Sequence, residues 1–538
     1  MWDIFPEKAY FDLHSDISLT LICENDCRTD ICVFKYGDIV RKFSFIASAG
    51  RSSFSFDAEK LERGGYFVQA SFFRKKQETV RQSAFVVGKN DMVMRYGFSC
   101  EFTAERENIS EEIDGFLRMH IDAIQFYDWA FRHDDLIPTS DIYSDLMGKQ
   151  NCLSTVSFLI THAHRHGLKS LGYGAVYASG SQYFSAHEDE GLYDGLGRPI
   201  TFIDIFHIMN ISRGCTWRNH IIKEFSKAVA EAGFDGIHMD TYGWPKSAFD
   251  KWGKRVNLET EFPSLIDECH EFISMECGKE PLLVFNNVGA WPVEETMKSY
   301  TDAVYCEIWP PMTRYSHLSC LMNKCSHGGK PVILACYPQA FRTDSPERAL
   351  EGELLLSFVI AMHGASQLFY GSIHRILTQG YYPDNSILEE WQEREIRRYQ
   401  DFFVRFQDIM YDRNMTDVSL THQDWDNPEY KFSIPSSASG EGGKVWCHIR
   451  ESMNRKAIYF VNLLNNDDLW NEGKSRPDCV SFSAAVLVLK KAERIWLASP
   501  ESGVSNVNYT LKETDKGLVL HCDISLDRVA MLYIEEEK

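Results

Sequence analysis

The stretch Phe234-Asp-Gly-Ile-His-Met-Asp-Thr-Tyr-Gly243 is a short apolar run that ends in a carboxylate, with aromatic residues and glycines around it. The preceding segment, residues 217–233, carries Ile221, Phe225 and Val229 at the i, i+4, i+8 spacing of an amphipathic helix and closes on a glycine. The pattern predicts a helix that leads directly into a buried strand.

The same alternation of short apolar runs with longer amphipathic stretches extends over the middle of the chain. The runs cover residues 95–102, 123–129, 169–177, 234–241, 281–287, 303–309, 331–337 and 366–371. Strands that alternate with helices are typical of parallel sheets, and eight such units are the number found in a (β/α)8, or TIM, barrel. We therefore expect a barrel over residues 93–410.

The flanking segments have a different pattern, in which apolar and polar residues alternate between turn residues. Residues 1–92 predict an N-terminal Ig-like β-sandwich, and residues 411–538 predict a C-terminal antiparallel β-sandwich. We expect three domains with these bounds. The tract 179–212, after the third barrel strand, shows no helical period and is expected to be a long loop that forms a lid or a binding wall.

Composition limits the class of ligand. The chain has 538 residues, a net charge of -21 and 13% aromatic residues. A charge of this sign repels phosphate backbones, so we expect no nucleic-acid partner. No run approaches the 18 or so apolar residues of a membrane span, so no membrane partner is expected. A neutral ligand fits better, and aromatic faces are what proteins lay against sugar rings, although most such rings are core.

The cysteines bear on compartment and cofactor. Fifteen are scattered along the chain, many within apolar runs, as Cys306 and Cys336 are, which indicates reduced thiols. No secretory signal is visible at the N-terminus, and we expect a cytoplasmic protein. Cysteine and histidine pairs at zinc-finger spacing and a Gly-x-x-x-x-Gly-Lys phosphate loop are missing from the sequence, so we expect neither a metal ion nor a cofactor.

Asp240 and Glu307 are the candidate catalytic residues. Each ends a predicted barrel strand, where reacting groups lie in such barrels. Period-two alternation puts His238 on the face of Asp240, and Trp309 on the face of Glu307. Taken alone, a strand-end carboxylate is more often a helix cap or an ion-pair partner, and a histidine below it is at least as often core. Two carboxylates facing one sugar are the minimum for glycoside hydrolysis, with retention or inversion left open by the sequence.

Four stretches together resemble glycoside hydrolase family 66, which holds endo-dextranases and cycloisomaltooligosaccharide glucanotransferases. They are Arg95-Tyr-Gly-Phe98, Ile124-Gln-Phe-Tyr-Asp-Trp129, Gly233-Phe-Asp-Gly-Ile-His-Met-Asp240 and Tyr305-Cys-Glu-Ile-Trp309. The resemblance implies a retaining hydrolase of α-1,6-linked glucan, dextran or isomaltooligosaccharides. In it, Asp240 matches the nucleophile and Glu307 the acid/base.

The resemblance also implies substrate contacts. Tyr127 and Asp128 fall where the family binds the sugar before the cleaved bond, and Tyr173 and Tyr177 fall in its third-strand motif. The predicted set of substrate-binding residues is completed by Trp129, His238, Tyr242 and Trp309.

Two other functions compete with hydrolysis. One is transglycosylation, in which a sugar hydroxyl replaces water, and the other is a catalytically silent carbohydrate-binding protein. Cyclising members of the family carry a module between the seventh strand and its helix, whereas here Cys336 is followed within a short link by a helix starting near Pro346. We therefore expect water to be the main acceptor.

Overall fold

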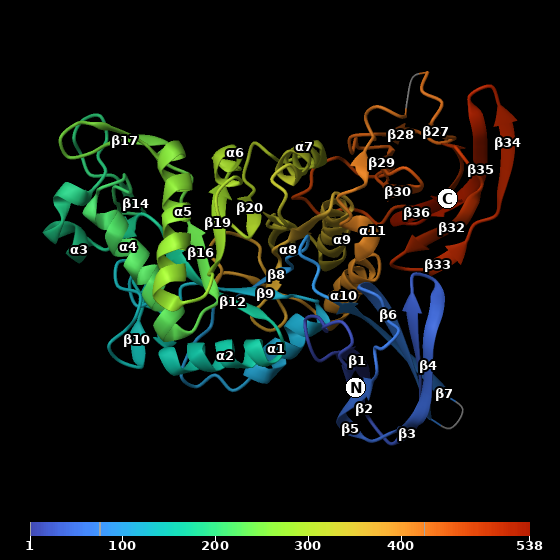
Figure 1. The fold of residues 1–538 in the computed structure, drawn as a ribbon, viewed down its shortest axis with the longest axis horizontal. Coiled ribbons are helices and arrows are strands. Elements are labelled where there is room, and N and C mark those ends of the chain that lie inside the picture. The colour runs from blue at the N-terminus through green and yellow to red at the C-terminus, as the bar shows by residue number, and fades with distance from the viewer. Residues whose placement is uncertain (1, 75–76, 424–425, 538) are drawn as a thin grey trace.

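A computed structural model describes residues 2–74, 77–423 and 426–537. Its centre is a curled sheet of parallel strands (Figure 1). In spatial order these are β22 (Ala365–Gln367), β21 (Val332–Ala335), β20 (Ala303–Glu307), β19 (Leu282–Val288), β16 (Gly236–Asp240), β12 (Lys169–Ala175), β9 (Ala123–Phe126) and β8 (Tyr96–Ser99). Each predicted run overlaps one of these strands. The short strand β23 (Tyr370–Gly371), just after β22, pairs in parallel with β8, Gly371 opposite Phe98.

Helices cover the outside of this sheet. They are α1 (Ile109–Arg118), α2 (Leu153–Arg165), α4 (Thr216–Lys227), α5 (Leu258–Cys277), α7 (Tyr315–Ser326), α9 (Pro346–Met362) and α10 (Glu390–Arg405). After β19 the chain forms only α6 (Val293–Thr296), four residues long, so the predicted strand-helix alternation is found with one helix reduced to a single turn. As predicted, α4 runs on, through a π-helical turn, to Gly233, which takes the left-handed conformation with φ 91°.

The tract 179–212 is more ordered than its sequence predicted, and the expectation of a long loop was wrong in part. It contains α3 (Ser181–Ala186), and a small sheet of β13 (Ala178–Ser179), β15 (Phe206–Ile208) and β14 (Thr201–Phe202). A helix of six residues is too short to show a period, and it is held by the buried Phe184. Tyr193 also pairs with Phe249, on the neighbouring hairpin of β17 (Ser247–Phe249) and β18 (Arg255–Asn257).

The N-terminal segment forms two antiparallel sheets over a common apolar core. One sheet has the order β1 (Asp3–Pro6), β2 (Ile17–Cys23), β5 (Gly50–Phe56); the other has β4 (Asp38–Ala47), β3 (Cys27–Lys35), β6 (Gly64–Arg74), β7 (Gln77–Val87). Burial alternates along strands such as β3, as the period-two pattern predicted.

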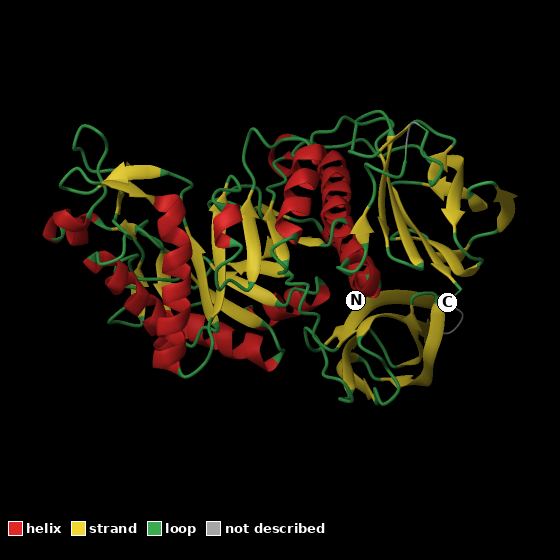
Figure 2. Cartoon of the chain, turned by 45° about the horizontal axis from the view of Figure 1, so that its top comes forward, coloured by secondary structure: helices red, strands yellow, loops and turns green. Residues whose placement is uncertain are grey.

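The C-terminal segment also forms two sheets with their own core. The larger has the order β26 (Thr416–Asp417), β29 (Val445–Glu451), β30 (Arg455–Asn462), β36 (Val529–Glu536), β32 (Ala492–Ser499), β33 (Gly503–Asn506), with β28 (Ser436–Ser437) beside β29. The smaller has β27 (Tyr430–Phe432), β31 (Val480–Val488), β35 (Gly517–Leu526), β34 (Tyr509–Thr514). The chain is thus multidomain and rich in strands (Figure 2).

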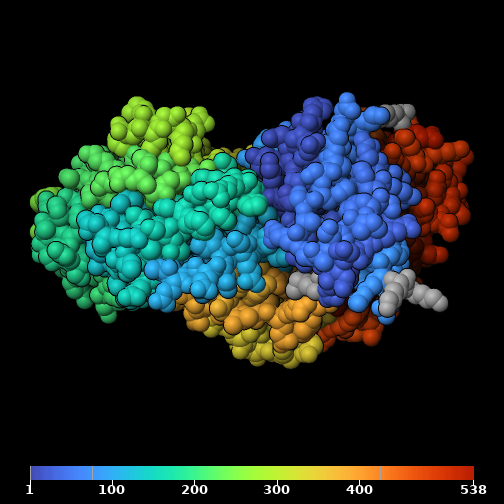
Figure 3. All heavy atoms as spheres, turned by 90° about the horizontal axis from the view of Figure 1, so that it is seen from below, coloured from blue at the N-terminus to red at the C-terminus, as the bar shows by residue number. Residues whose placement is uncertain are grey.

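Both β-rich segments lie on one side of the central sheet, and they lie next to each other (Figures 1 and 3). Arg397 of α10 pairs with the buried Asp3 at 2.7 Å, and Arg528 of the C-terminal segment donates a 2.6 Å bond to Glu351 of α9. Each of these charges has a partner of opposite sign, and breaking a buried ion pair is costly. The two pairs therefore fix how the flanking segments contact the central helices. Across the residues described, no helix is long and apolar enough to cross a membrane.

Candidate active site

Asp240 and Glu307 end two strands that flank a third. Asp240 is the last residue of β16, and Glu307 is the last residue of β20, with β19 between them. In register, Met239 of β16 lies opposite Phe285, and Glu307 lies opposite Val288. Parallel strands in register end at the same edge of the sheet, so both carboxylates reach the same pocket. The predicted pair is therefore brought together.

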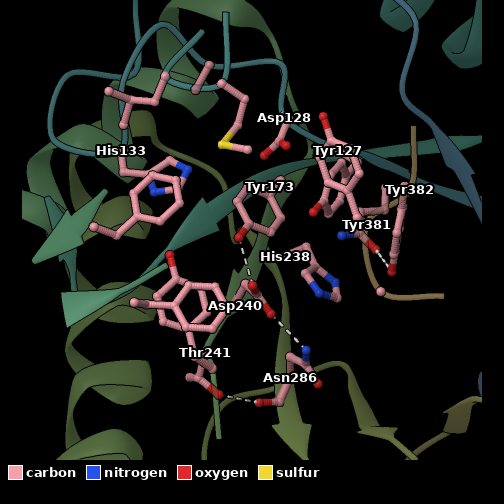
Figure 4. A pocket seen from close by; sticks show the side chains of 18 of the residues that line it. Tyr127, Asp128, His133, Tyr173, His238, Asp240, Thr241, Asn286, Tyr381 and Tyr382 are labelled. Carbon is pink, nitrogen blue, oxygen red and sulfur yellow. Dashed lines mark hydrogen bonds between the residues drawn. The ribbon is translucent and has the colours of Figure 1, made fainter. Parts of the chain in front are cut away.

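Three polar side chains hold the two carboxylates. The Tyr173 hydroxyl donates to Oδ2 of Asp240 at 2.7 Å (Figure 4). The Tyr337 hydroxyl donates to Oε1 of Glu307 at 2.7 Å. The amide of Asn286, on β19, donates to Oδ1 of Asp240 at 2.7 Å and to Oε2 of Glu307 at 3.1 Å. Each carboxylate is thus fixed by two donors, one of which they share.

Burial makes the two carboxyl groups hard to ionise. It raises the pKa of Asp240 to about 7, helped by the nearby charge of Glu307, while Tyr173 and Asn286 act in the opposite direction. Burial also raises the pKa of Glu307, against hydrogen bonds from Tyr337 and Asn286. Two carboxyl groups this close titrate as one coupled unit. Because both pKa values are raised, one carboxyl group can keep its proton while the other is ionised, which is the state that one nucleophile and one acid require.

The pocket above the pair has a volume of about 560 Å³. Its walls come from the ends of the strands, the segment after β9, the hairpin between β10 (Ile142–Ser144) and β11 (Gln150–Cys152), the 179–212 tract and the segment after β24 (Arg375–Ile376). Residues from the last three include Leu146 and Met147; Phe202, Ile203 and Phe206; and Gly380, Tyr381 and Tyr382. The tract 179–212 thus supplies one wall, as its length had indicated.

Aromatic rings line one side of this pocket. Tyr127 stacks on Tyr382 with ring centres 4.2 Å apart, and it also contacts Tyr173 at 5.1 Å (Figure 4). Beside Tyr127, Asp128 takes a left-handed conformation with φ 50°. Burial raises the pKa of Asp128 to about 7. A flat apolar wall with one polar group at its edge suits the faces and hydroxyls of a sugar.

The remaining predicted binding residues divide into two groups. Tyr242, His238 and Trp309 line the pocket, as do Tyr127, Asp128 and Tyr173. His238 lies below Asp240, shares a 3.1 Å hydrogen bond with the Tyr96 hydroxyl, and is uncharged, because burial lowers its pKa to about 3.

Trp129 and Tyr177 lie outside the pocket lining, so the structure does not place them against a substrate. The Trp129 indole is fully buried against Phe234 and donates a 3.1 Å bond to the backbone oxygen of Tyr173. The Tyr177 hydroxyl donates to the backbone oxygen of Trp244 at 3.0 Å and accepts from the Tyr242 backbone N–H. Both side chains support residues that do line the pocket.

Sequence reasoning missed Asn286, Tyr337, Tyr382 and Gly380. The period-two rule that indicated Asp240 also places Asn286 on the same strand face as Val284. The sequence therefore predicts the position of Asn286 but not its role. Tyr337 closes the predicted run 331–337 but lies two residues beyond the end of β21, and Gly380 and Tyr382 lie in the segment after β24, where no period applies. A metal was not expected, and among the described residues no group of three His, Cys, Asp or Glu side chains is arranged to hold one.

A curled parallel sheet with two carboxylates at its strand ends is typical of carbohydrate-active enzymes. Residues 37–522 match the family described as Glycosyl hydrolase family 66, and since this match spans most of the sequence, the chain belongs to that family.

Two relatives from Niallia circulans, both named cycloisomaltooligosaccharide glucanotransferase, are 26% and 25% identical over 371 and 312 residues. These matches cover 62% and 53% of this chain, but only 38% and 32% of the relatives' own length. The chain thus corresponds to about a third of the curated relatives it matches.

Solved structures show the same fold. A cycloisomaltooligosaccharide glucanotransferase from Paenibacillus sp., solved with cycloisomaltoheptaose, superposes with a TM-score of 0.88 at 16% identity, covering 99% of this chain and 100% of that one. A maltogenic α-amylase from Thermotoga neapolitana gives 0.54 at 11% identity, covering 83% of this chain and 99% of that one. At these identities the likeness concerns the fold alone.

Proposed function

We propose that this chain cleaves α-1,6-linked glucan through a covalent glycosyl-enzyme, with retention of configuration, and passes the glycosyl group to a sugar hydroxyl. The names of the Niallia circulans relatives support transfer on isomaltooligosaccharides. They favour transglycosylation over the hydrolysis that the sequence alone had led us to expect.

The observation that carries retention is the shared amide of Asn286. One nitrogen contacts Oδ1 of Asp240 at 2.7 Å and Oε2 of Glu307 at 3.1 Å. Oδ1 of Asp240 and Oε2 of Glu307 can therefore be no farther apart than the sum of these two distances. That sum is less than the roughly 6.5 Å that is the smallest separation of the two carboxyl groups in inverting enzymes. A water molecule does not fit between the carboxylates and a sugar at this spacing. The spacing supports a direct attack by one carboxylate.

In the first step ionised Asp240 attacks the anomeric carbon, while Glu307 gives its proton to the departing glycosidic oxygen. The carbon–oxygen bond of the substrate breaks, and an ester bond to Asp240 forms. In the second step Glu307 takes the proton of the acceptor hydroxyl, whose oxygen attacks the anomeric carbon and returns the bonding electrons to Asp240. The donors Tyr173, Tyr337 and Asn286 hold both carboxylates in place throughout.

Hydrolysis is the second candidate, favoured by the link between β21 and α9. This link contains only the four-residue helix α8 (Ala340–Thr343), so no domain lies there that could hold the free end of a glucan near the glycosyl-enzyme. A lower effective concentration of the sugar acceptor favours water.

We further infer that the curled sheet is a (β/α)8 barrel whose eighth strand consists of β22 and β23. The pairing of Gly371 with Phe98 supports closure between the last and first strands. We assign the domain bounds 1–92, 93–410 and 411–538, because the first and last segments have their own apolar cores.

Incubation with long isomaltooligosaccharides, followed by mass analysis, tests the function. Transfer predicts linear products longer than the substrate, or cyclic products that are one water lighter than linear glucans of equal length. Shorter linear glucans alone would establish hydrolysis instead. No turnover of any α-1,6-glucan, with folded protein, would leave only a carbohydrate-binding role.

A further inference from the structure

Among the described residues that line the pocket, Asn286 is the one whose side chain donates to both carboxylates. Its strand, β19, lies between the strands of Asp240 and Glu307, and its amide nitrogen donates to both. The Thr241 hydroxyl donates a 3.1 Å bond to the Asn286 backbone oxygen, which fixes the strand at this point (Figure 4).

The orientation of this amide is decided by charge. Its oxygen, Oδ1, is buried without a hydrogen-bond partner. An unpaired buried acceptor is costly, so the amide would turn if turning gained anything. Turning would point the amide oxygen at two carboxyl oxygens, which repel it whenever either carboxylate is ionised. The nitrogen therefore faces the pair as long as the pair carries negative charge.

In the reaction proposed above, on which this inference rests, the negative charge changes place. Before attack it lies on Asp240, and in the glycosyl-enzyme Asp240 is a neutral ester while Glu307, having given up its proton, is ionised. A hydrogen bond to an ionised acceptor is about twice as strong as one to a neutral acceptor. The amide N–H that contacts Asp240 therefore makes the stronger hydrogen bond before attack, and the N–H that contacts Glu307 makes the stronger hydrogen bond in the glycosyl-enzyme.

We propose that Asn286 is a positioning residue for both carboxylates: its amide holds Asp240 while the glycosyl-enzyme forms and holds Glu307 while it breaks down. Tyr173 and Tyr337 differ from it, because each serves a single carboxylate. The three side chains thus form a set of hydrogen-bond donors, in which Asn286 serves both carboxylates and each tyrosine serves one.

The set predicts distinct changes in the bell-shaped pH profile of kcat/KM on an isomaltooligosaccharide. Removing a donor from a carboxylate raises the pKa of that carboxyl group. Asn286→Ala should move both limbs upward by about one pH unit and lower kcat roughly 10- to 100-fold. Tyr173→Phe should move mainly the ascending limb, and Tyr337→Phe mainly the descending limb.

Other ionisable groups face the pair and remain in all variants. They are Asp128, Tyr127, Tyr177, Tyr242 and His238 around Asp240, and Tyr305 and Tyr382 around Glu307. Since they are common to every profile, the differences between profiles report the deleted donor.

Asn287→Ala is the control for loss of an amide from the same strand. The Asn287 side chain donates to the Tyr305 backbone oxygen at 2.8 Å and accepts from Thr296, both away from the carboxylates. This variant should lose stability and move neither limb.

Turnover by Asn286→Ala with both limbs unmoved, or with one limb moved, overturns this inference and leaves the proposed function standing. Absence of turnover by the wild type overturns both. If Asn286→Ala turns over too slowly for a profile, covalent labelling by a fluorinated glucosyl fluoride, followed by intact mass, reports Asp240 alone. Its pH midpoint should rise by about one unit, and an unchanged midpoint overturns the inference.

Discussion

The backbone of Gly380 lies directly against the carboxyl group of Glu307. A Cβ atom added at Gly380 would stand 3.1 Å from Oε1 of Glu307 and 3.3 Å from the indole of Trp309. Oε1 is held in place by the Tyr337 hydroxyl and has little freedom to retreat. A side chain at position 380 would therefore fit only if Glu307 or the segment after β24 moved by a few tenths of an ångström.

This contact predicts that side chains at position 380 slow the reaction. Gly380→Ala should lower kcat/KM about 3- to 10-fold and Gly380→Val more than that, because a misplacement of about 1 Å at reacting groups can cost up to 100-fold. Gly195→Ala is the control, since its nearest neighbour, Phe249, lies 3.8 Å from the new atom. Wild-type kcat/KM in Gly380→Val would show that Glu307 tolerates displacement, contrary to its assigned role.

The assignment of the pair predicts that Asp240→Ala and Glu307→Gln each remove most activity. General acid catalysis alone contributes roughly 100- to 10,000-fold, and both residues act on the same transition state. Azide should partly restore turnover of Asp240→Ala, with formation of a glycosyl azide. Retention of more than about a tenth of wild-type kcat by either variant would mean that the pair is misassigned.

The raised pKa of Asp240 predicts a pH-dependent cost in stability. The folded value is about 7, against roughly 4 in an unfolded chain. Between these values the folded protein keeps a proton that the unfolded chain has lost, so stability falls as pH rises through this window. Asp240→Asn removes the cost. Its unfolding free energy relative to wild type should rise, by an amount on the order of a few kcal/mol, from pH 4 to pH 8.

Asp235 supplies the control of opposite sign for these melting curves. Hydrogen bonds from His164 and the Ser170 backbone outweigh its burial and lower its pKa to about 2. Its contribution to stability is present above about pH 4 and is lost as pH falls from there through about pH 2, so the cost of Asp235→Asn should be nearly constant from pH 5 to pH 8 and should shrink only below about pH 4. A stability difference between Asp240→Asn and wild type that does not change with pH would contradict the raised pKa.

The cysteines predict a protein made in a reducing compartment, for which we propose the cytoplasm. All fifteen are present as thiols, and even the neighbouring sulfurs of Cys306 and Cys325 lie 4.0 Å apart, about twice a disulfide bond length. Thiol titration of the unfolded, unreduced protein should find nearly all of them. In the folded protein the exposed Cys320 and Cys479 should react first. Several stable disulfides would contradict this proposal.

Much of the site could be predicted because strand ends follow simple rules. The period of two and the apolar runs are enough to place Asp240 and Glu307 at the ends of parallel strands. The period-two rule did not predict which side chains face the pocket where the backbone leaves the extended conformation. Asp128 takes a left-handed φ of 50°, so Tyr127 and Asp128 both face the pocket and Trp129 turns behind the wall.

Other residues could not be predicted because tertiary contacts place them. Tyr382 reaches the pocket from the segment after β24, where its ring stacks on Tyr127. No local pattern in the sequence connects two residues so far apart. The helix α3 was missed for a different reason, since one and a half turns are too few to show a period.

The most direct test of this account is to trap the glycosyl-enzyme and find the residue that carries it. The protein would be treated with a fluorinated isomaltosyl fluoride, digested, and its peptides sequenced by mass spectrometry. The account predicts one sugar adduct per chain, as an ester on Asp240, which sits 2.7 Å from both the Tyr173 hydroxyl and the Asn286 amide. An adduct on Glu307 or Asp128, or rapid turnover of α-1,6-glucan with inverted products and no adduct, would contradict it.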